Sequence, residues 1–384
     1  MDSPFIYDRY VTGKNFIGRR NDCQILSNLL SQGEHVTLYA PPKSGKTSLI
    51  QQTLVNMRIA GVQFLVGNFS VLNIRTVEDF LKRMGSTVIR MVASTPEEYA
   101  DIVRNYLEGS HFVFDPRAFS EKDELLSLNW DMEPSDIDAV LSLPFKIAST
   151  TGKRMILIID EFQDLGMCDN PDMILRRMDA VMKDAKEKGL NKLSLVLCGS
   201  SVNAMKEIFE KGFLFYRYVE KLSLSTVPEG EITDHIVKGF LASGKVSGKD
   251  LFLGACSLLK NNLWYLNHFA AICDSMTKGY IMEPVLVDAL NCLIAIHEPR
   301  FRYLMDSLTT HQVSLLRATV EGVTRFSAAD VIRRYNLNSS ANVKRVKDAL
   351  MKKEILSFDE TDTPSFMDPL FEYWVRKYYF EIND

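Results

Sequence analysis

Short runs of apolar residues recur over residues 1–226, separated by segments with helical periodicity. The runs lie at His35–Ala40, Val62–Val71, Met155–Ile159, Leu193–Leu197 and Lys221–Leu224. The segments between them predict helices at Ser48–Met57, Val77–Val92, Ser135–Ser149 and Ile174–Glu187. Strands that are apolar on both faces and alternate with helices are typical of a parallel sheet covered on both sides. We therefore predict an α/β domain over residues 1–226.

Residues 227–384 show helical periodicity, with no strand pattern until the mid-350s. The first helices are predicted at Glu229–Leu241, Lys249–Lys260, Trp264–Thr277 and Glu283–Ile296. Pro299 is expected to close this helical block, residues 227–300. Residues 301–384 then predict helices at Thr309–Val320, Ser327–Tyr335 and Ser339–Met351 and strands at Ile355–Phe358 and Ser365–Met367. This succession is typical of a helix-turn-helix with a wing.

Composition excludes several classes of protein. Of the 384 residues, 46% are hydrophobic and 24% charged, which is enough apolar surface for a core and argues against wholesale disorder. No apolar run approaches the roughly 20 residues of a membrane span, and the N-terminus lacks the apolar block of a signal peptide. The six cysteines form no C-x-x-C pair, which argues against a zinc site or a disulfide framework. We expect a reduced, cytoplasmic protein with no membrane partner.

Charge is distributed unevenly, although the net charge is only −4. Residues 94–138 carry twelve acidic and three basic side chains, and we interpret them as an insert in the α/β domain. A lid, a partner surface and a disordered excursion all fit this insert. Residues 331–356 carry seven basic and two acidic side chains, so the winged helix is the basic module.

A phosphate-binding loop follows the first predicted strand. The run Ala40-Pro-Pro-Lys-Ser-Gly-Lys-Thr47 fits the phosphate-loop pattern except that Ala40 replaces the first glycine. Gly45 allows the backbone N–H groups to approach phosphate oxygens, Lys46 reaches the β- and γ-phosphates, and the Thr47 hydroxyl is a ligand for Mg²⁺. The residues predicted to bind nucleotide here are Pro42, Lys43, Ser44, Gly45, Lys46, Thr47 and Ser48.

Two carboxylates end the apolar strand Met155–Ile159. In a parallel sheet they lie at the edge where ligands of open α/β sheets bind. We expect Asp160 to hold Mg²⁺ and Glu161 to act as the general base that activates the attacking water. The alternative is a solvated strand end, but the spacing from the phosphate loop favours a nucleotide site.

Polar residues also follow the next strand. Ser200 and Ser201 could sense the γ-phosphate or the attacking water, or a hydroxyl could cap the helix that begins near Asn203.

The third helix of the winged-helix module is basic. Its apolar positions Val343, Val346, Leu350 and Met351 predict a buried stripe, with the charges off that stripe. Contact with DNA phosphates is one interpretation of these charges. The other is that the module binds a protein or packs within the chain, with solvated side chains. The candidate DNA-binding residues are Arg333, Arg334, Lys344, Arg345 and Lys347.

Taken together, these motifs resemble those of the archaeal-type ATPase family, a branch of the AAA+/STAND nucleotide-driven switches. The resemblance spans nearly the whole chain. It rests on Phe16-Ile-Gly-Arg19, the phosphate loop, I-I-D-E-F-Q-D-L, L-C-G-S-S, Phe215-Tyr-Arg217 and the closing Met367-Asp-Pro-Leu-Phe-Glu-Tyr-Trp374. It implies a P-loop parallel sheet of the AAA+/STAND type, a helical lid (227–300) and a winged-helix domain (301–384).

The resemblance also implies roles for residues outside the loop. Phe16, Ile17, Gly18 and Arg19 correspond to a segment that packs against adenine, with ordinary core packing as the alternative. Arg217 corresponds to the arginine motif of the family. Acting in trans, it would reach the γ-phosphate bound by a neighbouring subunit, which implies a homo-oligomer. Acting in cis, it would report the nucleotide state of its own chain. A surface ion pair is the third interpretation of Arg217.

Two departures from the family pattern bear on function. Leu263, followed by Trp264 and Tyr265, stands where the family often has the proline of Gly-x-Pro, and no arginine occurs between Tyr218 and Pro299. A sensor arginine in the lid is therefore absent, which favours a slow switch over a processive motor. We expect an ATP hydrolase that uses ATP and Mg²⁺, releases ADP, and moves its lid and winged helix, on double-stranded DNA. The alternative is a non-catalytic, nucleotide-locked regulator whose winged helix binds a protein partner.

Overall fold

The computed structural model describes residues 3–118, 120, 123–212 and 214–382. Phe119, Glu121 and Lys122 of the acidic insert therefore lie outside the described residues. The chain divides into two units, which are described separately. The sheet unit comprises residues 20–40 and 52–224, and the helical unit comprises residues 1–19, 41–51 and 225–384.

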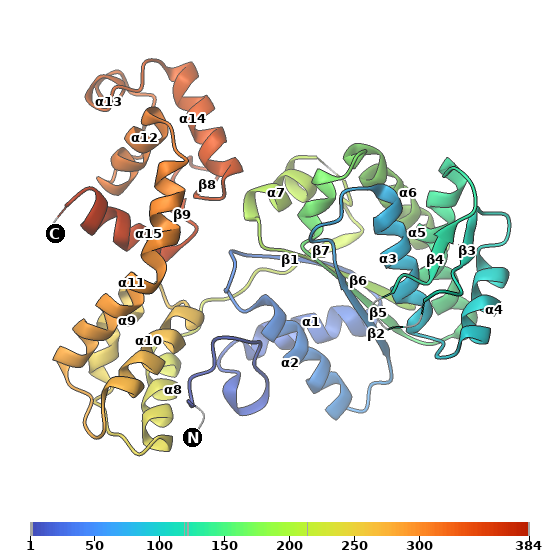
Figure 1. The fold of residues 1–384 in the computed structure, drawn as a ribbon, viewed down its shortest axis with the longest axis horizontal. Coiled ribbons are helices and arrows are strands. Elements are labelled where there is room, and N and C mark those ends of the chain that lie inside the picture. Colours follow the sequence, from blue (N-terminus) through green and yellow to red (C-terminus); the bar gives the residue numbers. More distant parts are fainter. Residues whose placement is uncertain (1–2, 119, 121–122, 213, 383–384) are drawn as a thin grey trace. The chain divides into compact units, whose positions relative to one another are not determined.

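A parallel sheet of five strands organises the sheet unit (Figure 1). Its order is β2-β5-β6-β1-β7, formed by Leu65–Ser70, Met155–Asp160, Leu193–Gly199, His35–Tyr39 and Val219–Lys221. Every residue of β1 and β6 is buried, as the continuous apolar runs predict. The parallel α/β fold expected from the sequence is confirmed. Because β1, β5 and β6 are neighbours and parallel, their carboxyl ends share one edge of the sheet.

The last strand differs from its prediction by a few residues. The sequence places it at Lys221–Leu224, whereas β7 is Val219–Lys221, which pairs with β1 from His35 opposite Val219. Glu220 and Lys221 are exposed because β7 is an edge strand. An edge strand with polar side chains has no apolar run to reveal it.

Helices pack around the sheet. They are α1 (Arg20–Gln32), α3 (Val77–Arg90), α4 (Pro96–Tyr106), α5 (Pro134–Thr151), α6 (Pro171–Glu187) and α7 (Val202–Lys206). Helix α5 packs against both α3 and α6. Short 3₁₀ and π turns add η2 (Phe162–Met167) and η3 (Glu207–Lys211). Helix α2 (Lys46–Ile59) begins in the helical unit and ends in the sheet unit.

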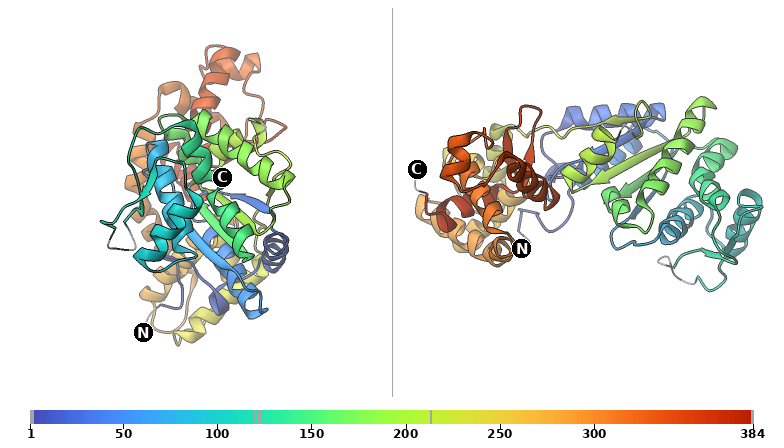
Figure 2. Two further views of the ribbon diagram at one scale, coloured as in Figure 1. Left: turned by 90° about the vertical axis from the view of Figure 1, so that its right-hand side faces the viewer. Right: turned by 90° about the horizontal axis from the view of Figure 1, so that it is seen from above.

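The described part of the acidic insert is ordered. It contains α4 and the hairpin of β3 (Phe112–Phe114) and β4 (Leu126–Leu128), which pack on α3 (Figure 2). A capping box at Thr95 and Glu98 starts α4. The buried Asp136 accepts hydrogen bonds from the backbone N–H groups of His111 and Glu133, both at 2.7 Å. Burial opposes ionisation there, yet these bonds lower the pKa of Asp136. A disordered excursion is therefore wrong for the described residues.

The helical unit contains the remaining helices. They are η1 (Gly13–Asn15), α8 (Glu229–Ala242), η4 (Asp250–Phe252), α9 (Leu253–Leu258), α10 (Leu263–Met276), α11 (Glu283–Asp306), α12 (Thr310–Val320), α13 (Ala329–Arg334), α14 (Ser340–Lys352), α15 (Pro369–Trp374) and η5 (Val375–Tyr379). An antiparallel hairpin of β8 (Leu356–Phe358) and β9 (Pro364–Phe366) forms the wing. One apolar core runs from Phe5 through the lid helices to Trp374.

Two helix predictions in this unit are wrong. Lys249–Lys260 is not one helix but a 3₁₀ turn, η4, followed by the short α9. Pro299 does not close the lid, because α11 continues through it to Asp306. A proline inside a helix removes one backbone hydrogen bond. Phe301 and Met305, both buried in the core beyond Pro299, offset that loss by packing. The division into domains at residues 226 and 300 stays a prediction.

Candidate functional site

The phosphate loop lies between β1 and α2. Gly45 has a φ of +93°, and a Cβ there would lie 2.9 Å from the Nη1 atom of Arg19. Glycine is therefore required at this position, as the motif predicts. Lys43 also has a positive φ, +65°, without being glycine. The Nζ atom of Lys46 donates a hydrogen bond of 3.1 Å to the carbonyl oxygen of Pro41, so this side chain folds over its own loop.

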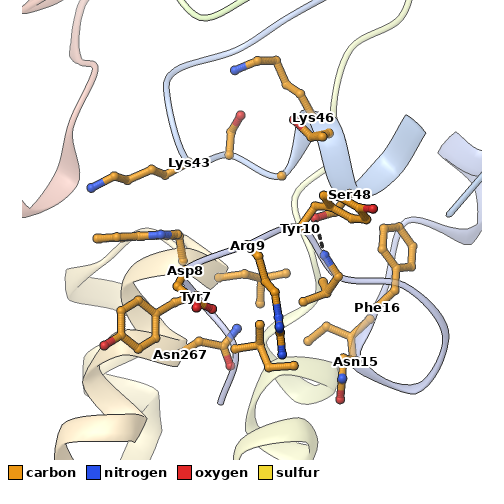
Figure 3. A pocket seen from close by; sticks show the side chains of 18 of the residues that line it. Tyr7, Asp8, Arg9, Tyr10, Asn15, Phe16, Lys43, Lys46, Ser48 and Asn267 are labelled. Carbon is orange, nitrogen blue, oxygen red and sulfur yellow. Dashed lines mark hydrogen bonds between the residues drawn. The ribbon is translucent and has the colours of Figure 1, made fainter. Parts of the chain in front are cut away.

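A pocket of about 340 Å³ lies against this loop within the helical unit. In Figure 3, Lys43 and Lys46 lie on one side of it, and Tyr7 and Asn267 lie on the other. The backbone N–H of Val11 donates a hydrogen bond of 3.1 Å to the Oγ atom of Ser48, which ties the N-terminal segment to the start of α2. The lining residues are Ile6, Tyr7, Asp8, Arg9, Tyr10, Val11, Asn15, Phe16, Ile17, Arg19, Lys43, Ser44, Gly45, Lys46, Thr47, Ser48, Leu263, Trp264 and Asn267.

Most residues expected to bind nucleotide share this pocket. Phe16, Ile17 and the run Lys43–Ser48 line it, whereas Pro42 and Gly18 do not. Gly18, with a φ of +62°, instead lies against Val227, to which a Cβ would come within 2.8 Å. The pocket thus joins the phosphate loop and two lysines to apolar and aromatic side chains.

Arg19, also expected to bind nucleotide, lines the pocket and is hydrogen-bonded to the backbone of the phosphate loop. Its Nη1 atom donates a hydrogen bond of 2.7 Å to the carbonyl oxygen of Ser44, and its Nε atom donates one of 2.9 Å to that of Ser225. The guanidinium therefore connects the loop to the segment that leads into α8. This geometry supports the loop backbone.

The carboxylate of Glu161 lies in a hydrogen-bonded cluster of the sheet unit. Its Oε2 atom accepts bonds from the Ser200 hydroxyl at 2.7 Å, the Ser200 backbone N–H at 3.1 Å and the Gln163 Nε2 atom at 2.7 Å. Glu161 has a φ of +51°. Asp160, the last residue of β5, accepts a hydrogen bond of 3.0 Å from the Glu161 N–H. The structure thus brings Glu161 and Ser200 together, and the three donors fix the direction of the carboxylate.

Ser201 and Arg217 have different environments from Ser200. Ser201 occupies the N-cap position of α7, but its side chain makes no capping hydrogen bond. Arg217 is exposed, has a φ of +71° and lies over the ring of Tyr216 at 5.3 Å. Among the described residues, no carboxylate forms an ion pair with Arg217. The surface ion pair suggested for it is therefore not observed.

The basic residues of the winged helix fall into two groups. Lys344 and Arg345 are exposed on α14 and form no ion pair with a described carboxylate. By contrast, Arg334 pairs with Glu321 at 2.9 Å, and the Arg333 Nε atom donates to the Ala329 carbonyl. Lys347 pairs with Asp362 and lies 4.1 Å above the Phe358 ring. Val343, Val346 and Leu350 are buried, as the stripe predicts.

Solved structures and a family of domains resemble this chain. A Walker-type ATPase of Pyrococcus abyssi superposes with a TM-score of 0.66 at 15% sequence identity, covering 97% of this chain and 99% of that one. The ADP form of the ORC2 protein of Aeropyrum pernix superposes with a TM-score of 0.57 at 13% identity, covering 98% of each chain. Its ADPNP–ADP complexes give 0.55 at 14% identity, covering 95% of this chain and 93% of that one. Residues 299–377 match the family described as a probable winged helix domain.

The chain shares the fold of these solved structures, a parallel α/β sheet followed by helices, and residues 299–377 form a winged helix domain. A search of proteins with curated functions found no match to the sequence. The structural similarity therefore confirms the predicted fold class.

The closing motif of the chain, residues 367–374, has a structural explanation. Asp368 caps α15 by accepting hydrogen bonds from the N–H groups of Leu370 and Phe371 at 3.0 and 3.1 Å. The same carboxylate accepts bonds of 2.8 Å from the Tyr265 hydroxyl and 2.6 Å from Arg300. Burial, and then the Asp368 charge, raise the pKa of Tyr265. Helices α10 and α11 are thereby connected to α15.

Several pocket residues have no signal in the sequence. Tyr7, Asp8 and Asn267 have no motif of their own, and the fold brings them to the loop from more than 30 residues away on either side. Trp264 is the exception, because it lies in the segment where this sequence departs from the Gly-x-Pro pattern of the family. That departure is a sequence signal for its place in the pocket. Among the described helices, none has the length and apolar character that crossing a membrane requires.

Proposed function

We propose that this chain binds Mg-ATP in the pocket against the phosphate loop and hydrolyses it slowly. The observation that carries this proposal is the composition of the pocket. Loop amides, Lys46 and Thr47 supply the polar part of its lining, and Phe16 and Ile17 supply apolar and aromatic surface. Polyphosphate binds the first set and a purine base the second. No guanine-recognition N-K-x-D motif occurs in the sequence, which favours adenine.

The chemistry assigned to the chain is phosphoryl transfer to water. Glu161 is proposed as the general base, with its Oε2 atom held by Ser200 and Gln163. The Thr47 hydroxyl and the Asp160 carboxylate are hard oxygen donors, which suit Mg²⁺, and the bound ion would neutralise phosphate charge. Lys46 would stabilise the charge that develops on the γ-phosphate. Arg217, exposed and strained, is proposed to contact the nucleotide in trans within a homo-oligomer or in cis.

The lid and winged helix are proposed as the moving parts. Leu263, Trp264 and Asn267 of the lid line the same pocket as the loop, so a bound nucleotide would touch both. Differential contact of this kind is what shifts a conformational equilibrium. The winged helix is proposed to bind double-stranded DNA through Lys344 and Arg345, so that its movement changes that contact. The second candidate, a nucleotide-locked regulator with a protein partner, is favoured by the three donors on Glu161, because they restrain the base.

Calorimetric titration tests the binding half of this proposal. We expect ATP to bind the wild-type chain in the presence of Mg²⁺, GTP to bind more weakly, and Lys46→Ala to abolish ATP binding. The matched control is Lys14→Ala, a lysine of the N-terminal segment that does not line the pocket. Equal ATP affinity in wild type and Lys46→Ala would contradict the assignment of the site.

A further inference from the structure

Lys43 occupies a backbone conformation that a lysine seldom adopts. Its φ of +65° lies in the left-handed region, where glycine is favoured and other residues are strained. The loop already has a glycine at residue 45, so flexibility alone does not explain the lysine. Strain of this kind at a ligand-binding loop points to a use for the side chain.

The side chain of Lys43 lies on an aromatic platform formed by the lid. Its Nζ atom lies 3.4 Å from the centroid of the Trp264 ring and 5.9 Å from that of Tyr265. Other rings pack edge-on against the indole with centroids 4.9 to 5.9 Å away, and these are Tyr7, Tyr265, His268 and His297. The platform is therefore rigid, and its face attracts a cation.

The platform is uncharged and partly shielded from water. His268 and His297 are buried, and each has one ring nitrogen with no hydrogen-bond partner among the described residues. Burial, followed by the positive charge of Lys43, lowers the pKa of both, that of His297 to about 4. Neither histidine therefore opposes the lysine with a charge of its own near neutral pH.

Charges of both signs act on the ammonium of Lys43. Burial and then the positive charge of Arg300 lower the pKa of Lys43, whereas the negative charge of Asp368 raises it. No ion pair joins Lys43 to a carboxylate of the described chain. Lys43, Trp264, Lys46 and Thr47 all line the same pocket. A polyanion in that pocket competes directly with the indole for this cation.

We propose that Lys43 is a second phosphate-binding cation of the loop, stored on Trp264 in the nucleotide-free chain and transferred to the phosphates of a bound nucleoside polyphosphate. The inference rests on the proposed nucleotide site. It gives the Lys43 side chain a specific role there and adds a route from the loop to the lid. Transfer uncovers Trp264, and the next residue, Tyr265, is bonded to Asp368 at the start of α15. Phosphate binding is thereby communicated from the loop to the lid and the winged helix.

Nucleotide affinities test the competition between the indole and the phosphates. We expect Lys43→Met to weaken ATP binding about tenfold, because a charge-assisted bond to phosphate is lost. Trp264→Leu strengthens ATP binding about threefold, since the competing cation–π contact is removed. In the Lys43→Met background Trp264→Leu gives no strengthening, and Lys43→Arg restores most of the wild-type affinity. Unchanged affinity in Lys43→Met, or equal effects of Trp264→Leu in both backgrounds, would overturn the proposal.

Tryptophan fluorescence emission distinguishes the proposed transfer from a purely structural role of Lys43, because a structural role would leave the response to ATP unchanged. The chain has three tryptophans, of which Trp130 is 72% exposed and Trp374 is buried, so Trp130→Phe leaves Trp264 as the environment-sensitive one. In the Trp130→Phe background, we expect ATP to shift the emission wavelength of Trp264. Adding Lys43→Met should give the same shift without nucleotide, and ATP should then cause no further shift. A full ATP-induced shift in Lys43→Met contradicts the transfer.

The two proposals fail in different ways. If Lys46→Ala binds ATP as the wild type does, the nucleotide site itself is wrong. If ATP binds the Trp130→Phe chain by calorimetry and its emission stays constant, the site stands and the role of Lys43 is wrong.

Discussion

Glu161 is held more tightly than a general base in bulk water would be. Three donors meet at its Oε2 atom, and two of them come from Ser200. Gln163, which supplies the third, is itself buried with its Oε1 atom unpartnered in the described chain. An unsatisfied buried amide oxygen is costly, so this glutamine is retained at a price in stability. The cluster thus sets the direction of the Glu161 carboxylate.

Replacing Glu161 by glutamine separates binding from chemistry. The amide keeps the shape of the side chain but cannot take a proton from water, so turnover is expected to fall by about 10²–10⁴-fold. ATP affinity is expected to remain within about threefold of wild type. Phosphate release and calorimetry measure the two quantities. Equal turnover in Glu161→Gln would remove this residue from the mechanism.

Asp368 connects three segments of the helical unit through one carboxylate. Asp368→Ala removes the cap of α15 and leaves the Tyr265 hydroxyl and Arg300 without this acceptor. We expect the free energy of unfolding to fall by about 2 kcal/mol, since the carboxylate is partly exposed and its ion pair with Arg300 adds little. Urea titration of the whole chain measures the change. Asp362→Ala, an exposed carboxylate of the wing, is the control, and an equal loss in both variants would contradict the role of Asp368.

At the scale of single elements, β1 begins with a buried histidine. The Nδ1 atom of His35 accepts a hydrogen bond of 3.0 Å from the Leu195 N–H of β6, so the ring must be neutral there. Burial, and then the nearby Lys186, lower the pKa of His35 to about 4. The first strand of the sheet therefore depends on an uncharged side chain.

This histidine predicts a pH dependence of stability. The pKa of His35 is below its unfolded value of 6.5, so its contribution is present above pH 6.5 and is lost as the pH falls toward 4. We expect a loss of about 2 kcal/mol between pH 6.5 and 5. Urea titrations at the two pH values measure it, with His35→Gln as the comparison. If the wild type and this variant lose the same stability over that range, the buried neutral ring is not the cause.

Helix α14 is the element on which the proposed DNA binding depends. Lys344 and Arg345 are exposed, whereas Lys347 is already engaged by Asp362 and Phe358. The double change Lys344→Ala and Arg345→Ala is expected to reduce the slope of log affinity against log salt by about 2 for duplex DNA. Lys347→Ala is the matched control and should change the slope by less than half as much. If the salt slope of the double variant equals that of the wild type, α14 does not contact DNA phosphates and is assigned to protein contact.

At the scale of the whole molecule, the order of elements was largely predictable. Continuous apolar strands, the phosphate loop and the wing of Leu356–Phe358 follow from local patterns. The edge strand β7 and the passage of α11 through Pro299 depend on tertiary packing, which local patterns do not contain.

The candidate site was predictable only in part. The loop and the Asp160–Glu161 pair follow from their motifs. The Lys43–Trp264 contact joins residues 221 positions apart, and the bond from Ser200 to Glu161 joins residues 39 apart. Such contacts are set by the fold and leave no signature in one sequence.

The proposed ATPase activity is measured as phosphate release from Mg-ATP by the full chain. We expect slow release by the wild type, background release by Lys46→Ala and Glu161→Gln, and a faster rate when duplex DNA is present. Release by the wild type no faster than by Lys46→Ala, with ATP bound, would contradict the claim that the chain is an ATPase and leave the nucleotide-locked regulator.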